Sequence, residues 1–247
     1  MSMQRTAERL LKAASDVFEG RRQSEDEPDT AGEMQTRRRL MLAGREVFGR
    51  KGPSVTVREI CYAAKANIAA VNYHFGSKEG LLAEVLAELL DELLVMYPMH
   101  GGVQGDAPAK ERLHGFVFAF LCRILLPFGR EDERMLGLML SEAFVRPIRS
   151  FEAYAQKHRD AVREFLSPLL LELARKGEVT AQGPDDRRIQ MIVRSIVAQI
   201  LFYNTNRAAL MAQREGKPFK PDEILDVALH ITSFSLGGIN HISEQLK

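Results

Sequence analysis

Apolar residues recur at helical spacing along nearly the whole chain, and this pattern restricts the fold more than any other feature. Successive segments carry apolar side chains three or four residues apart, whereas alternation of apolar and polar residues bounded by turn signals is hard to find. Glycine, proline and polar residues end the segments, for example at Gly52-Pro53 and over residues 98–108. We therefore expect an all-α fold.

The 247 residues are enough for one large domain or two smaller ones. We expect an N-terminal extension over residues 1–32, formed by a helix from Thr6 to Gly20 and a flexible polar linker. Residues 33–80 are expected to form a small three-helix domain. Residues 81–247 would then form a larger helical domain.

Residues 33–80 contain the densest local signals. Thr56 and Glu59 are spaced as in a capping box, in which each side chain satisfies a backbone amide at a new helix start. Asn67 is a suitable N-cap for the next short helix, residues 68–75. With Val71 and Phe75 turned inward, the outward face of that helix carries Ala69, Ala70, Asn72, Tyr73 and His74.

Charge is segregated along the chain, although the net charge is only +1. Between Arg37 and Lys78 there are nine Lys or Arg residues against Glu46 and Glu59. Such a surplus is typical of a surface that binds a polyanion, and a solvated helix face is the alternative.

Two short helices joined by a tight turn are suited to reading DNA. The major groove, about 12 Å wide, admits one helix, and small side chains allow that helix to approach the bases. Asn72 is placed to pair with a base edge, and Tyr73, His74 and Lys78 to hold phosphates. A generic helical hairpin remains the alternative on these grounds.

The stretch from Thr36 to Leu82 closely resembles the DNA-binding domain of TetR family regulators. Its Thr56-Val-Arg-Glu-Ile, Tyr73-His-Phe, Ser77-Lys and Leu81-Leu elements have the spacing of that family. The long extension before Thr36 departs from the family pattern. The resemblance implies binding to double-stranded operator DNA through a helix-turn-helix, with DNA contacts at Thr56, Arg58, Asn67, Ala69, Ala70, Asn72, Tyr73, His74 and Lys78.

The rest of the chain resembles the family's larger domain only in layout, which implies a homodimer formed by two C-terminal helices of each subunit. Two apolar stripes are suited to that interface, and Gly237 and Gly238 permit close helix contact. The alternative is that the stripes form the core of one subunit. A dimer is favoured because it spaces two reading helices about 34 Å apart. The candidate interface residues are Ile192, Ile196, Ile200, Leu225, Ile231, Leu236 and Ile239.

The same layout implies a pocket for an unidentified small-molecule effector. Apolar and aromatic residues of the central helices would line it, and polar residues among them would orient the ligand. Each of these residues has a core or surface position as its alternative. The candidates are Phe120, Arg123, Met139, Glu142, Phe144, Phe202 and Tyr203.

Enzymatic function finds little support in the sequence. A glycine-rich phosphate loop, a nucleophile elbow and a zinc pattern are missing, and the six histidines show no close pairing. We expect no catalytic residues, no cofactor and no metal site. The predicted function is a DNA-binding transcriptional regulator, a repressor released from a palindromic operator by its effector; a helical protein-interaction module without sequence-specific DNA binding is the alternative.

The sequence predicts no association with a membrane. The longest apolar run, residues 115–128, contains Arg123 and is much shorter than the roughly 20 residues that span a bilayer. The N-terminal segment is charged and amphipathic, unlike a secretory signal. We therefore expect a cytoplasmic location.

Overall fold

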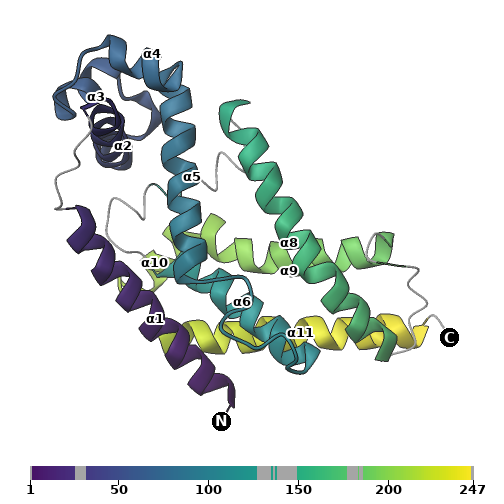
Figure 1. Cartoon of the computed structure of the whole chain (residues 1–247). Helices are drawn as coiled ribbons and strands as arrows, with labels where there is room; N and C mark the ends of the chain where they lie inside the picture. Colours follow the sequence, from purple (N-terminus) through teal and green to yellow (C-terminus); the bar gives the residue numbers. More distant parts are fainter. Residues whose placement is uncertain are drawn as a thin grey trace. The chain divides into compact units, whose positions relative to one another are not determined.

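A computed structural model of the chain describes residues 2–25, 32–126, 135, 137, 149–176, 183 and 186–245. Every regular element in these ranges is a helix (Figure 1), so the predicted all-α fold is confirmed. Among the helices described, none is long and apolar enough to cross a membrane. The elements are α1 (Ser2–Glu25), α2 (Gly32–Lys51), η1 (Gly52–Ser54), α3 (Val57–Ala63), α4 (Ala69–Phe75), α5 (Lys78–Met96), α6 (Ala109–Leu125), α8 (Arg149–Lys176), α9 (Arg187–Thr205), α10 (Arg207–Gln213) and α11 (Pro221–Gln245).

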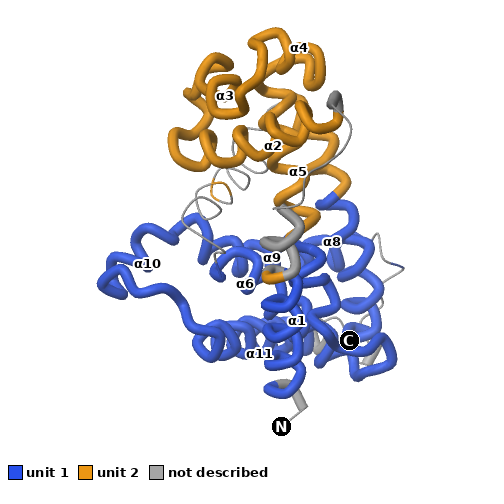
Figure 2. Tube along the Cα trace, turned by 60° about the vertical axis from the view of Figure 1, so that its left-hand side comes forward, with its two compact units in different colours: residues 1–18, 93–126, 158–247 blue, residues 19–92, 127–157 orange. Residues whose placement is uncertain are grey.

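The chain divides into two compact units (Figure 2). Unit 1 contains residues 1–18, 93–126 and 158–247, and unit 2 contains residues 19–92 and 127–157. Helices α1, α5 and α8 each contribute residues to both units. Because these three helices continue from one unit into the other, the units do not test the predicted boundaries after residues 32 and 80, which stay a prediction.

The N-terminal helix α1 is longer than its sequence predicts. It continues to Glu25, so the prediction of an end at Gly20 was wrong. The residues after this glycine are mostly Arg, Gln and Glu, which favour helix enough to offset its cost of about 1 kcal/mol. The first part of α1 is packed within unit 1, where it buries Ala7, Leu10 and Ala14.

Helix α6 lies at the centre of unit 1. It packs against α11 and α9, and every residue from Leu113 to Leu125 is buried. A helix that is apolar on all sides is stable only when other elements cover all of it. Two polar side chains, His114 and Arg123, are buried together with this helix.

The loop between α5 and α6 approaches the backbone of α6 at a pair of glycines. Gly101 has a φ of +58°, and a Cβ atom at this position would lie 2.0 Å from the carbonyl oxygen of Gly115. A Cβ atom at Gly115 would lie 2.8 Å from the carbonyl oxygen of His100. Only glycine permits this contact at both positions, because any Cβ would collide with backbone.

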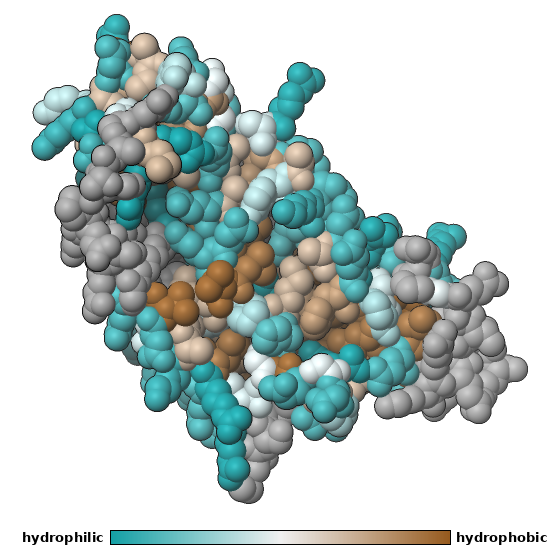
Figure 3. Space-filling model, viewed as in Figure 1, coloured by the Kyte–Doolittle hydropathy of each residue, from teal (hydrophilic) through white to brown (hydrophobic). Residues whose placement is uncertain are grey.

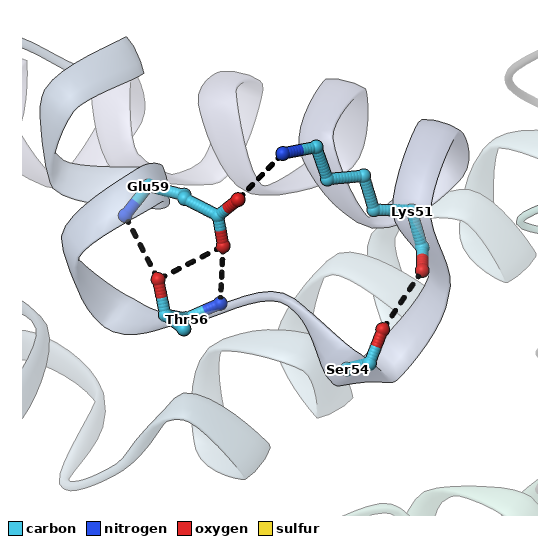
Figure 4. A network of polar contacts seen from close by, with 4 residues as sticks. All are labelled: Lys51, Ser54, Thr56 and Glu59. Atoms are coloured by element: carbon cyan, nitrogen blue, oxygen red, sulfur yellow. Dashed lines mark hydrogen bonds and ion pairs between the residues drawn. The ribbon is translucent and has the colours of Figure 1, made fainter.

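A capping box begins α3, as predicted (Figure 4). The Thr56 hydroxyl accepts a hydrogen bond from the Glu59 N–H at 3.3 Å, and the Glu59 carboxylate accepts one from the Thr56 N–H at 2.8 Å. Lys51 also donates to this carboxylate. The bonds from Lys51 and Thr56 favour the ionised form and lower the pKa of Glu59 to about 2.

His114 links α6 to α11 as a neutral side chain. The Thr232 hydroxyl donates to the Ala228 carbonyl at 2.7 Å, and its oxygen lies 3.5 Å from His114 Nδ1. His114 is 5% exposed, and burial lowers its pKa to about 4. The unit therefore folds around an uncharged imidazole at neutral pH.

The capping box gives a prediction about stability. Thr56→Ala removes the side-chain acceptor at the start of α3, which should lower the free energy of unfolding by about 1 kcal/mol. Thr56→Ser retains a hydroxyl and should keep most of that stability. Urea unfolding at one protein concentration measures both variants, and an Ala variant as stable as the unchanged protein would contradict the assigned role of the cap.

Buried His114 predicts a pH dependence of stability. Between pH 6.5 and pH 4 the unfolded chain binds a proton at this imidazole that the folded chain does not bind. The free energy of unfolding therefore has its full contribution from neutral His114 above pH 6.5, and this contribution decreases as the pH falls toward 4. We expect a loss of about 2 kcal/mol between pH 7 and pH 5 in urea unfolding. His114→Gln should lose measurably less over that interval, and equal losses would rule out this origin.

Candidate nucleic-acid interface

Helices α2, α3 and α4 pack together in unit 2. Each helix contributes apolar side chains to a small shared core, and α4 contributes Val71 and Phe75. Arg45 of α2 is largely buried and pairs with Glu92 at 2.8 Å, so this arginine serves the fold. The buried apolar side chains of this core include Leu40, Val47, Phe48 and Ile60.

A tight turn connects α3 to α4. Lys65 adopts a left-handed backbone conformation, with a φ of +49°, between the end of α3 at Ala63 and the start of α4 at Ala69. The Asn67 side-chain oxygen accepts a hydrogen bond from the Ala69 N–H at 2.9 Å. Asn67 thereby satisfies an amide at the start of α4, although the helix begins at Ala69, one residue later than predicted, with Ile68 at the N-cap position.

The start of α5 is fixed beside this pair of helices. Ser77 Oγ accepts a hydrogen bond from the Gly80 N–H at 3.0 Å, as expected of an N-cap. Lys78 Nζ donates to the Pro53 carbonyl at 2.8 Å, which holds the ammonium next to η1. The Arg37 guanidinium lies 5.3 Å from the centre of the Phe75 ring.

The predicted DNA-contact residues all lie in unit 2, and none of them belongs to its core. Thr56, Arg58, Asn67, Ala69, Asn72 and Tyr73 are exposed, and Ala70, His74 and Lys78 are half-buried. Tyr73 is the clearest case, because 74% of this large aromatic residue is exposed. An aromatic ring that leaves the core at such a position is available for contact with a partner.

One exposed aromatic residue of this region was missed by the sequence reasoning. Tyr62 on α3 is 89% exposed. The pattern does hold a signal, since Ile60 faces inward and a residue two positions later lies on the opposite side of a helix. Tyr62 is therefore a further candidate for contact with DNA.

The predicted dimer residues divide into two groups. Ile196, Ile200, Ile231 and Ile239 are at most 2% exposed, so the chain itself covers them. Ile192, Leu225 and Leu236 are half-buried. The large apolar side chains that α9 and α11 expose are instead Met191, Phe202, Leu229 and Phe234. On the face drawn in Figure 3, apolar side chains reach the surface over the helices of unit 1.

The predicted effector residues are also divided. Phe120 and Arg123 are buried in α6, Tyr203 is half-buried, and Phe202 is 52% exposed. Met139, Glu142 and Phe144 lie outside the described residues. A cavity of about 380 Å³ occurs elsewhere in unit 1, lined among others by His100, Arg112, Phe165 and Leu169.

Two family models match the chain. Residues 40–85 match the bacterial regulatory proteins of the tetR family. Residues 109–239 match the C-terminal domain of the HTH-type transcriptional dual regulator CecR. The Shigella flexneri regulator of that name is 41% identical over 196 residues, which cover 76% of this chain and 84% of the relative.

Solved structures are similar to the fold. A TetR-like transcriptional regulator from Rhodococcus sp. RHA1 has a TM-score of 0.58 at 17% identity, covering 86% of this chain and 100% of its own. AibR, in complex with isovaleryl coenzyme A and operator DNA, has a TM-score of 0.54 at 15% identity, covering 81% of this chain and 97% of its own.

These matches agree with the local geometry, in which a capped α3, a tight turn and the exposed face of α4 form a helix-turn-helix. The relatives are regulators of transcription and not enzymes. The chain therefore belongs to the TetR family of bacterial regulatory proteins and is a DNA-binding transcriptional regulator.

Proposed function

We propose that this regulator represses transcription as a homodimer on a palindromic operator and is released by a small-molecule effector. The observation that carries the proposal is the outward face of α4, where Asn72 and Tyr73 are exposed while Val71 and Phe75 hold the helix in the core. A face of this kind fits the major groove. The binding of both a ligand and operator DNA by AibR supports the same scheme for a chain of similar fold.

The contacts with DNA divide by their chemistry. Asn72 is proposed to read a base edge, since its amide can donate to and accept from an adenine at once. Tyr73, His74 and Lys78 are proposed to bind backbone phosphates, and Thr56 and Arg58 to do so from the start of α3. Of the three remaining candidates, Ala69 and Ala70 have small side chains that allow close approach to the groove, and Asn67 holds the start of α4.

The homodimer is proposed to form through α9 and α11. Leu229 and Phe234 are 58% and 68% exposed on α11, and the same helix carries exposed Gly237 and Gly238. Among the described residues, a Cβ atom at either glycine would meet nothing within 4 Å apart from its own stretch of helix, so a partner helix has room to approach. Paired subunits would bring two reading helices to successive turns of the operator.

Release by the effector is proposed as a population shift. A ligand that binds better to dimers whose reading helices do not fit consecutive major grooves would favour those dimers and empty the operator. Helix α5 is the proposed connection, because it begins at Lys78, beside the proposed DNA contacts, and continues into residues of unit 1.

Two substitutions separate base reading from phosphate binding. Asn72→Ala should reduce the preference for operator over scrambled DNA at least tenfold, because a bidentate base contact contributes about 1–3 kcal/mol. Lys78→Ala should weaken binding to every sequence and lower the slope of log affinity against log salt by about one. Fluorescence anisotropy over a salt series measures both quantities. Lys110→Ala, an exposed lysine of unit 1, is the matched control.

Two results of this experiment would contradict the assigned contacts. If both variants change sequence preference and salt dependence in the same way, the assigned roles of Asn72 and Lys78 are wrong. A change in the Lys110 variant as large as that in the Lys78 variant would mean that the charge of the whole chain, not a local contact, sets affinity.

The operator itself can be recovered from fragments of the source genome that the purified protein retains. We expect a palindromic site preferred over scrambled DNA by roughly a thousandfold, and a promoter fused to this site should be less active when the protein is present. Because the Shigella flexneri relative is a dual regulator, an increase in promoter activity is the outcome that would reject repression. Equal affinity for all fragments at every salt concentration would favour an interaction module without sequence-specific binding.

A further inference from the structure

Arg123 is a buried cation whose hydrogen-bonding capacity is largely unused. It lies in the last turn of α6 and is 3% exposed. Its Nε donates a long hydrogen bond of 3.4 Å to the Ala119 carbonyl, and its guanidinium carbon lies 4.8 Å from the centre of the Phe120 ring. Among the described residues, neither Nη1 nor Nη2 has an acceptor.

The guanidinium keeps its charge in this position. Burial lowers the pKa of Arg123 to about 10, which still leaves the group protonated at neutral pH. The carbonyl end of α6 and the face of Phe120 both attract a cation, but neither supplies an acceptor to the two terminal nitrogens. A buried charge of this kind is ordinarily paired, because its desolvation is otherwise uncompensated.

A second arginine of the same helix does have acceptors for its guanidinium nitrogens. Arg112 donates to the Ala107 carbonyl at 3.0 Å through Nε and pairs through Nη2 with Glu172. Arg112 is also more exposed than Arg123. The more buried of the two arginines thus has fewer acceptors, the reverse of the arrangement that stabilises a folded chain.

We propose that Arg123 binds the carboxylate of an apolar, singly charged organic acid, and that such acids are the effector class of this regulator. The inference rests on the effector release proposed above. The two terminal nitrogens of a guanidinium form a planar fork that matches the two oxygens of a carboxylate. Bound in this way, the acid would supply the acceptors that Nη1 and Nη2 lack.

The surroundings of Arg123 favour a carboxylate over a phosphate monoester. One guanidinium neutralises one charge, whereas a phosphate monoester carries between one and two charges at neutral pH. The Phe120 ring lies against the guanidinium, and the residues beside Arg123 along the helix, Leu121, Ile124 and Leu125, are buried and apolar, so this part of α6 suits a hydrocarbon body.

The test uses acids together with their uncharged amides, on the full-length protein. The probes are butanoate, octanoate, dodecanoate, benzoate and phenylacetate, each paired with its amide, and binding is measured by thermal melting and titration calorimetry. At least one acid should raise the melting temperature by several degrees while its amide does not. Arg123→Met should lose affinity for that acid at least tenfold, and Arg123→Lys should lose less because it retains the charge.

Arg112→Met is the matched control, since it makes the same substitution on the same helix and alters the lining of the 380 Å³ cavity. It should bind the acid as the unchanged protein does. Without ligand, Arg123→Met should unfold at the same urea concentration as the unchanged protein or at a higher one, because it removes an unpaired charge. A lower urea midpoint would show that Arg123 is paired within the chain, which would overturn the proposal.

The remaining outcomes separate this inference from the proposed function. The inference is overturned if no acid of the panel binds, if amides bind as tightly as acids, or if Arg112→Met loses the acid while Arg123→Met keeps it. Release of the operator by a neutral or cationic compound alone would leave effector release standing and reject the acid class. An acid that binds through Arg123 without weakening operator binding would confirm the site and reject its role in release.

Discussion

The burial of α6 from Leu113 to Leu125 is the constraint on which the rest of unit 1 depends. Each large apolar side chain removed from water contributes about 1.5–3 kcal/mol, and every residue of this stretch is buried. Only a surrounding layer of helices can provide such cover, and α9 and α11 belong to that layer. Ile196, Ile200, Ile231 and Ile239 of these two helices are buried in the unit, so a different set of apolar residues reaches its surface.

The geometry of the helix-turn-helix, in contrast, depends on local sequence signals. The capping box at Thr56, the Asn67 acceptor and the Ser77 cap each act within three residues of sequence. Such signals can be recognised in a single sequence, so the start of α3 and the short α4 could be predicted, the latter to within one residue. The exposure of Asn72 and Tyr73 followed from the same reasoning, once Val71 and Phe75 were assigned to the core.

Features that depend on contacts between distant segments of the chain could not be predicted in this way. An apolar stripe has the same spacing whether it faces its own chain or a second one, so Ile196 and Ile231 could not be assigned from the pattern. Phe202 is aromatic like a pocket residue and yet is exposed. The packing of α1 within unit 1 depends on contacts between segments far apart in the chain. The buried, unpaired state of Arg123 likewise appears only when the helices around α6 are assembled.

The contact between Gly101 and Gly115 limits how this protein can change over time. Polar contacts tolerate exchange, because another donor or acceptor can replace a lost one. Here the space itself is filled by backbone, so any side chain at either position displaces the loop from the helix. The same loop contributes His100 and Val103 to the wall of the 380 Å³ cavity. The contact fixes the path of the loop, so on that side the shape of the cavity can change through the identity of its side chains and not through the path of the backbone.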